Sequence, residues 1–250
     1  MTSVTLEVSD RVATLTLRRP ESLNAFDLDL ARRLREAVEA VAASDAEALV
    51  VAGEGRAFSA GGDVRAMAAS GDAAAYLSAL TEDVHGALAA MRELPLPVIA
   101  RVHGPVAGGG LGLMLAADIA VAADSATFTA AYGAIGLSPD CGVTALLPRV
   151  IGEARARAFL LGGRRIDAAT ARDWGLVVRT AALDDLDAAV AEEVELARGA
   201  GRDAVAATKA LLTDDGYRAQ LDRERDRICA LAAGSAAPRI AAFAERARAR

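Results

Sequence analysis

Aromatic residues, cysteine, lysine and histidine are all scarce in this chain of 250 residues. Aromatic residues make up 4% of it, there are two cysteines and two histidines, and Lys209 is the only lysine among 28 basic residues. Two cysteines are too few for a disulfide framework and indicate a reducing compartment. The histidines, cysteines and carboxylates are not spaced as metal ligands, so we predict no metal site.

Long hydrophobic runs and a surplus of positive charge are missing as well. The most apolar segment, 104–117, is short and rich in glycine, which is typical of a buried helix rather than a membrane span. The net charge is −6 and no basic stripe follows any helix, which argues against nucleic acid as a partner. The N-terminus enters a strand pattern at once, without the pattern of a signal peptide, so we expect a cytoplasmic protein.

Strand and helix patterns alternate over the first 180 residues. Residues 4–8 and 12–17 alternate with period two, and the apolar runs 48–52 and 98–102 are typical of buried parallel strands. Helices are expected after Asp27 and over 72–92, and the pattern becomes purely helical from about residue 184. We therefore predict an α/β core of repeated ββα units over 1–183 and a helical C-terminal subdomain over 184–250.

Two glycine-rich turns stand out, about fifty residues apart. They are 53–63, which ends in Ala60-Gly61-Gly62-Asp63, and 106–112, which contains Gly108-Gly109-Gly110. Each lies where a strand gives way to a helix, and a helix N-terminus presents free N–H groups that attract negative charge. Two such donors that converge on one carbonyl oxygen would form an oxyanion hole.

These turns resemble those of the enoyl-CoA hydratase/isomerase (crotonase) family. Further similar patches are Leu23-Asn24-Ala25, His103-Gly104-Pro105, Ala117-Asp118-Ile119 and Gly136-Leu137-Ser138-Pro139-Asp140. The resemblance implies a crotonase fold, a substrate that is an acyl-CoA thioester, no cofactor beyond the CoA moiety of that substrate, and assembly into a homotrimer or a dimer of trimers through the C-terminal subdomain.

The resemblance also assigns candidate site residues. It implies that the N–H groups of Ala60 and Gly109 form the oxyanion hole, and that Ala60, Gly61, Gly62 and Asp63 contact CoA. Leu23 and Arg65 are further candidate CoA contacts, although Arg65 could equally be a solvated helix residue. Phe243 lies in a segment that resembles the tail by which family members reach a neighbouring subunit's CoA site.

Both catalytic glutamates of the family's hydratases are absent. Gly112 occupies the first position and Tyr132 the second. Glycine has no side chain and an unperturbed tyrosine has a pKa of about 10, so neither can exchange a proton near neutral pH. Hydration by two glutamates is therefore not expected.

Asp140 is the remaining candidate for the proton carrier. Its segment resembles the phenylacetate-pathway enoyl-CoA isomerase branch, which implies that its carboxylate moves a proton between C2 and C4 while a double bond shifts from the 3,4 to the 2,3 position. The structural alternative is that Asp140 caps a helix that begins near Cys141. Tyr132 could bind substrate, orient Asp140 or line the acyl pocket, and Cys141, His85 and His103 are interpreted as structural.

Other functions stay open at this point. A hydratase or another enolate-forming lyase could use a different set of residues, and ring closure of the naphthoate-synthase type also tolerates glycine at the first glutamate position. A catalytically silent acyl-CoA binder would explain why both glutamates are missing. Asp140 separates these hypotheses, because a binder has no need of a carboxylate in an apolar pocket.

Overall fold

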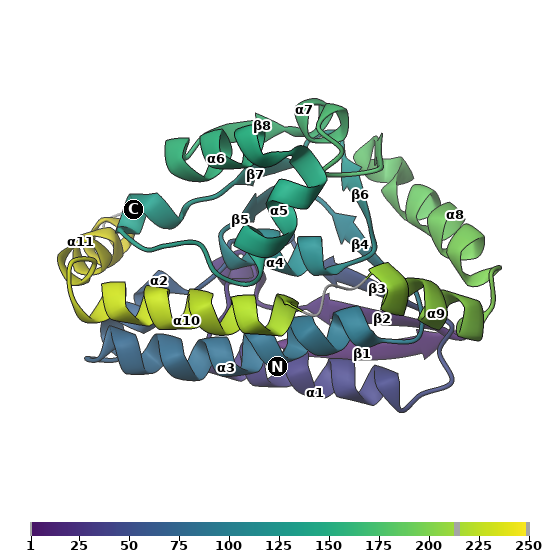
Figure 1. The fold of residues 1–250 in the computed structure, drawn as a ribbon, viewed down its shortest axis with the longest axis horizontal. Coiled ribbons are helices and arrows are strands. Elements are labelled where there is room, and N and C mark those ends of the chain that lie inside the picture. Colours follow the sequence, from purple (N-terminus) through teal and green to yellow (C-terminus); the bar gives the residue numbers. More distant parts are fainter. Residues whose placement is uncertain (1, 213–215, 249–250) are drawn as a thin grey trace.

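A computed structural model describes residues 2–212 and 216–248 of the chain. The larger of its two sheets forms the centre of the molecule. Its order is β1-β2-β3-β4-β6-β9; β1 and β2 are antiparallel and all other neighbours are parallel (Figure 1). The strands are β1 (Val4–Ser9), β2 (Val12–Leu17), β3 (Ala48–Gly53), β4 (Val98–Val102), β6 (Ile119–Ala123) and β9 (Arg179–Ala181). Every residue of β3 is buried, as its apolar run predicted.

The smaller sheet has the order β5-β7-β8, and its strands are β5 (Pro105–Ala107), β7 (Thr127–Thr129) and β8 (Arg165–Asp167). Strand β5 follows β4 closely, and β7 follows β6, so the chain passes from the larger to the smaller sheet before the helix Gly109–Ala116 and again before the helix Val143–Ile151. This arrangement confirms the predicted ββα units. The sequence pattern did not reveal these three-residue strands, because three residues show too little alternation.

The helices of the core begin at the capping residues that the sequence offers. Asp27, Asp63 and Asp72 accept bonds from the first N–H groups of α1, α2 and α3. These helices, with the next three in chain order, are α1 (Leu28–Ala42), α2 (Val64–Ala69), α3 (Ala73–Glu93), α4 (Gly109–Ala116), α5 (Val143–Ile151) and α6 (Glu153–Gly162). The alanine-rich stretch 66–75 is divided between α2 and α3 at Gly71, whose φ is +78°.

After β9 the described chain is helical, as the pattern from residue 184 predicted. The helices from residue 168 onward are α7 (Ala168–Asp173), α8 (Leu186–Arg198), α9 (Arg202–Leu212), α10 (Tyr217–Ala233) and α11 (Ala237–Arg248); short 3₁₀ turns occur at Pro20–Ser22, Tyr132–Ile135 and Leu183–Asp185. In Figure 1, α10 lies along α3, α8 lies beside β4 and β6, and α11 contacts α2. The C-terminal helices therefore complete the core and bring α10 and α11 close to the site. Their role in trimer formation stays a prediction.

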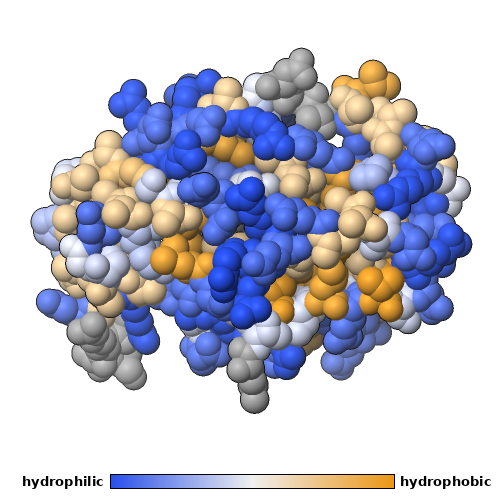
Figure 2. Space-filling model, turned by 90° about the horizontal axis from the view of Figure 1, so that it is seen from below, coloured by the Kyte–Doolittle hydropathy of each residue, from blue (hydrophilic) through white to orange (hydrophobic). Residues whose placement is uncertain are grey.

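Figure 2 shows the molecule from below the view of Figure 1, and the surface on this side mixes charged and apolar residues. Helix α1 carries ion pairs, among them Arg35 with Glu39 and Arg33 with Asp29. Among the described residues, no single helix has both the length and the apolar character of a membrane span. The pair Tyr217–Ala233 and Ala237–Arg246, bent by 78°, meets those two criteria only when both halves are combined.

Candidate active site

A cavity of about 620 Å³ opens between the two glycine-rich turns, α3, the Asp140 segment and the C-terminal helices. Its walls are largely apolar, with Leu77, Leu80 and Val84 from α3 and Ile228 from α10. Most of the predicted site residues line it, namely Leu23, Ala60, Gly62, Asp63, Arg65, Gly109, Tyr132, Asp140 and Phe243. Segments more than two hundred residues apart in the sequence therefore meet at one cavity.

A parallel pairing places the two glycine-rich turns side by side. Ser59 pairs with Val106, and the N–H of Ala107 donates to the carbonyl oxygen of Ser59 at 3.0 Å. Both segments continue in the same direction beyond this pair, so Gly62 and Gly109, each three residues further on, lie at equivalent positions. Gly62 lies just before α2, and Gly109 lies in the first turn of α4. The predicted convergence of the two turns is present.

The donors that face the cavity differ from the predicted pair at one position. The N–H of Ala60 donates to the carbonyl oxygen of Leu23 at 2.9 Å, so it is not available to a ligand. Within the described residues, the N–H groups of Gly62 and Gly109 have no acceptor, and both glycines line the cavity. The structure therefore replaces Ala60 by Gly62 as the partner of Gly109. The motif located the turn, but only the hydrogen bonds show which N–H is unused.

Close backbone contact explains the glycines in both turns. A Cβ on Gly61, whose φ is +84°, would lie 2.7 Å from the nitrogen of Gly109. A Cβ on Gly109 would lie 3.1 Å from Sγ of Cys141 and 3.2 Å from the ring of Phe26. A side chain at either position would push the turns apart or occupy the space beside the free N–H groups.

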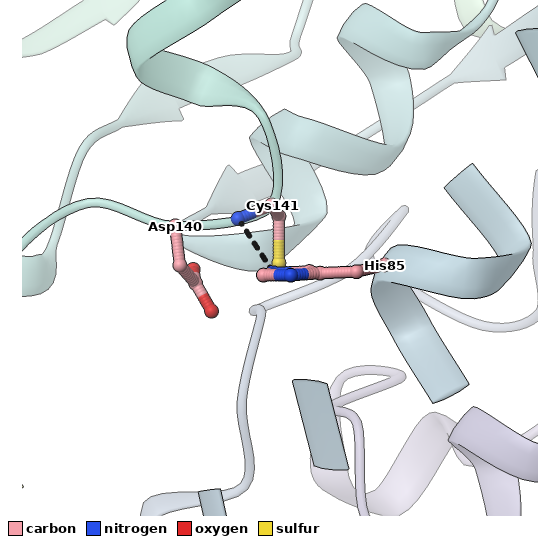
Figure 3. A group of neighbouring side chains, drawn as sticks. All are labelled: His85, Asp140 and Cys141. Atoms are coloured by element: carbon pink, nitrogen blue, oxygen red, sulfur yellow. Dashed lines mark hydrogen bonds between the residues drawn. The ribbon is translucent and has the colours of Figure 1, made fainter. Parts of the chain in front are cut away.

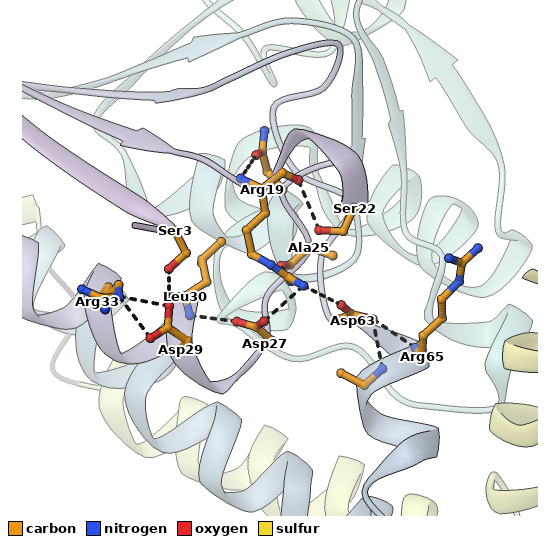
Figure 4. Close-up of polar contacts among 12 residues, drawn as sticks. Ser3, Arg19, Ser22, Ala25, Asp27, Asp29, Leu30, Arg33, Asp63 and Arg65 are labelled. Atoms are coloured by element: carbon orange, nitrogen blue, oxygen red, sulfur yellow. Dashed lines mark hydrogen bonds and ion pairs between the residues drawn. The ribbon is translucent and has the colours of Figure 1, made fainter. Parts of the chain in front are cut away.

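Asp63 fixes the first turn rather than offering its charge to a ligand. Its carboxylate accepts from the N–H groups of Arg65 and Ala66 and lies 3.1 Å from the guanidinium of Arg19. Arg19 also contacts Asp27 at 3.1 Å, so its positive charge is shared between two carboxylates (Figure 4). The side chain of Arg65 extends away from this cluster in Figure 4 and is exposed.

Asp140 presents a buried carboxylate to the cavity. Its side chain is 7% exposed and, among the described residues, forms no ion pair. Burial raises the pKa of Asp140 to about 6, against the opposing effect of hydrogen bonds with Cys141 and Tyr132. A carboxyl with a pKa in this range can both accept and return a proton near neutral pH.

The structural alternative for Asp140 is not supported. Helix α5 begins after Gly142 and receives no cap from the side chain of Asp140. The N–H groups at its start bond to Glu224 of α10, at 2.7 Å from Gly142 and 3.0 Å from Thr144. Glu224 thus takes the capping role, and the Asp140 carboxylate is left to the cavity.

Tyr132 lies against Asp140, as one of the three hypotheses proposed. Its hydroxyl donates to the main-chain oxygen of Asp140 at 3.1 Å, and the ring also lines the cavity. Burial raises the pKa of Tyr132 well above its ordinary value, so the hydroxyl stays a donor. The side chain therefore holds the Asp140 turn and forms part of the wall.

His85 and Cys141 flank Asp140 on the other side (Figure 3). One possible ligand atom from each of the three residues lies within 4.8 Å of the others, which the sequence spacing did not suggest. The Nε2 of His85 accepts from the N–H of Cys141 at 3.3 Å, so the lone pair that a metal would need is already used. Burial lowers the pKa of His85 to about 4 and raises that of Cys141, which keeps both side chains neutral. The cluster serves to hold the turn.

The turn at Cys141 also explains the glycine at position 112. A Cβ there would lie 2.4 Å from both Cβ and the carbonyl oxygen of Cys141. The space into which a side chain at 112 would extend is therefore filled by the turn that carries Asp140. A glutamate at 112 is incompatible with this arrangement of Asp140.

Phe243 and Leu23 complete the mouth of the cavity. Phe243, in α11, lines the cavity of its own chain and is 37% exposed, and its contact with a neighbouring subunit's site stays a prediction. Leu23 adopts a left-handed conformation with φ 55°, which turns its carbonyl oxygen toward the N–H of Ala60. Helix α11 thus contributes to the cavity of its own chain.

Comparison with known families and proteins identifies the family of this chain. Residues 7–232 match the family described as enoyl-CoA hydratase/isomerase. The chain belongs to this family. It is 36% identical to 1,2-epoxyphenylacetyl-CoA isomerase of Escherichia coli (strain K12) over 173 residues, which span 68% of this chain and 66% of that protein. It is 34% identical to 4-chlorobenzoyl coenzyme A dehalogenase-2 of an Arthrobacter species over 76% of this chain and 70% of that one.

Solved structures show the same fold over almost the whole chain. An enoyl-CoA hydratase from Bacillus halodurans superposes with a TM-score of 0.90 at 26% identity and covers 96% of this chain and 99% of its own. A putative enoyl-CoA hydratase from Streptomyces coelicolor A3(2) is 35% identical with a TM-score of 0.78, covering 90% and 85%. The two sheets and helical C-terminal region are the crotonase fold that the sequence predicted.

Proposed function

We propose that this protein is an enoyl-CoA isomerase that shifts a 3,4 double bond of an acyl-CoA thioester to the 2,3 position. The observation that carries the proposal is the placement of one buried carboxylate, Asp140, in the same cavity as the free N–H groups of Gly62 and Gly109. These three groups suffice for the reaction, because it needs one site for negative charge and one proton carrier.

The glycine turns supply the site for negative charge. Removal of a C2 proton leaves a dienolate, whose charge resides largely on the thioester oxygen. The N–H groups of Gly62 and Gly109 would donate to that oxygen, and the N-terminus of α4 adds the positive end of its dipole. Backbone donors held by parallel pairing need no rearrangement when the charge develops.

Asp140 then moves the proton. Its ionised carboxylate takes a proton from C2, the electrons of that bond form the enolate, and the protonated carboxyl returns the proton to C4. The C3=C4 bond is thereby replaced by C2=C3, with no net gain or loss of atoms. The pKa of about 6 makes both half-steps accessible near neutral pH.

Hydration is a weaker alternative, because it needs groups that hold and activate a water. Gly112 supplies no side chain, and the Tyr132 hydroxyl is already bonded to Asp140. Glu21 and Asp63 also line the cavity, but Glu21 lies in the turn before Leu23 at the mouth and Asp63 caps α2. A silent binder would have no use for a buried carboxylate whose burial raises its pKa.

The CoA end of the substrate would lie at the mouth. Arg56 and Arg65 are exposed there, and their positive charge suits the phosphates of CoA. The names of the relatives, which are CoA-thioester enzymes, support this class of substrate. Assembly as a trimer or a dimer of trimers is part of the same proposal.

A turnover screen tests the proposed reaction. The protein is incubated with 3-enoyl-CoA and 2-enoyl-CoA thioesters of several chain lengths, with straight and aromatic acyl groups, and the products are separated by chromatography. We expect 3-enoyl thioesters to yield 2-enoyl products without 3-hydroxyacyl products. Hydration of 2-enoyl thioesters at a comparable rate would reject the proposal in favour of a hydratase.

A further inference from the structure

Glu224 is a buried carboxylate behind the Asp140 turn. It lies in α10, it is 3% exposed, and it is not among the residues that line the cavity. Its two oxygens accept from the N–H groups of Gly142 and Thr144 and from the hydroxyl of Thr144. A carboxylate removed from water to this extent is stable only where such donors replace its hydration.

The Asp140 turn depends on supports from outside its own segment. Cys141 and Gly142 have φ values of +59° and +76°, and a left-handed conformation is unfavourable for a residue with a Cβ. Three N–H groups of this short segment are held by side chains of two distant helices, Cys141 by His85 of α3, and Gly142 and Thr144 by Glu224 of α10. Glu224 thus contributes two of the three bonds.

We infer that Glu224 is a positioning residue, which holds the left-handed turn at Cys141–Gly142 and so aims the Asp140 carboxylate into the cavity. This inference rests on the proposed role of Asp140. Because Glu224 does not face the cavity, it cannot reach a substrate and acts through Asp140 alone. The C-terminal helix α10 is thereby part of the machinery that sets the proton carrier.

Replacement of Glu224 by glutamine tests the inference with little change in shape. The amide has one acceptor oxygen, so its NH₂ group faces one of the two N–H donors and the turn loses a support. We expect Glu224→Gln to lower kcat and C2 proton exchange by about 10-fold, and Glu224→Ala by up to about 100-fold, the scale of a small misplacement of a catalytic group. KM should change little, because the cavity walls and the glycine turns are untouched.

Asp226→Asn is the matched control. Asp226 is an exposed carboxylate two residues further along α10, so its replacement removes the same charge from the same helix without touching the turn. Circular dichroism and thermal melting of each variant give the folded fraction, and rates are expressed per folded protein. If Glu224→Gln does not fold, Thr144→Val serves instead, since it removes the hydroxyl that donates to Glu224.

A double-mutant cycle with Asp140→Asn separates positioning from a general structural effect. We expect Glu224→Gln to have no further effect on the residual exchange of Asp140→Asn, because the group that it positions is already lost. Wild-type exchange in folded Glu224→Gln, or an equal loss in both backgrounds, would overturn the inference while leaving Asp140 as the proton carrier. Wild-type exchange in Asp140→Asn itself would instead reject the proposed function, and the inference with it.

Discussion

The two halves of the site, the paired glycine turns and the Asp140 turn, are built in different ways. The glycine turns present main-chain N–H groups, and a strand pairing between Ser59 and Val106 together with the local helix starts fixes their positions. The Asp140 turn presents a side chain, and its conformation depends on His85 and Glu224, which are distant in the sequence. The first half is therefore fixed by main-chain pairing, and the second by side chains of two distant helices.

The two halves suit two different tasks, because the glycine turns would stabilise negative charge and the Asp140 turn would transfer a proton. A backbone donor is rigid and cannot titrate, which suits the stabilisation of a developing oxyanion. A proton carrier needs a pKa near neutrality, and for Asp140 burial supplies it. Substitutions can therefore alter each half separately.

Gly109→Val should abolish measurable turnover. The new side chain would begin 3.1 Å from Sγ of Cys141 and 3.2 Å from Phe26, and it would fill the place of the thioester oxygen. The loss of an oxyanion donor alone lowers rates by about 100- to 1,000-fold. Steady-state turnover of a 3-enoyl thioester measures the effect.

Gly162→Val is the matched control for this substitution. A Cβ at position 162, at the end of α6, meets only the side chain of Arg164, at 3.6 Å or more. It should leave turnover unchanged. Substantial turnover by a folded Gly109→Val protein would show that the oxyanion site lies elsewhere.

Asp140→Asn should stabilise the fold at neutral pH. The pKa of Asp140 is raised in the folded state, so its contribution to stability is fully present below the unfolded-state value of 3.8 and is lost as the pH rises through about 6. Above that pH the buried charge reduces the free energy of unfolding by up to about 3 kcal/mol. Urea unfolding should show a larger gain from Asp140→Asn at about pH 8 than at about pH 5. An equal gain at both would contradict the assigned pKa shift.

Tyr132→Phe should have the smallest effect. It removes one neutral hydrogen bond to the main-chain oxygen of Asp140, worth about 1 kcal/mol, and keeps the ring that lines the cavity. We expect a decrease in kcat of several-fold and little change in KM. A change in KM alone would instead assign the hydroxyl to substrate binding.

The sequence predicted the elements whose signals are local. Strand β2, helix α1 with its cap Asp27, and the glycine turns all followed from periodicity, a capping residue or a motif. It could not show that the N–H of Ala60 is bonded to the carbonyl oxygen of Leu23, which is why the N–H of Gly62 stands in the proposal instead. It also missed Glu224, since a glutamate within a charged helix gives no signal that it is buried until α10 is packed against the Asp140 turn.

C2 proton exchange by Asp140→Asn tests the central claim most directly. Asparagine keeps the shape of the side chain but cannot accept a proton, and exchange of the C2 hydrogen of a saturated acyl-CoA with solvent deuterium, followed by NMR or mass spectrometry, reports enolate formation without a complete turnover. The account predicts a folded variant that still binds the thioester and exchanges at least about 100-fold more slowly than the wild type. Exchange near the wild-type rate would show that another group carries the proton.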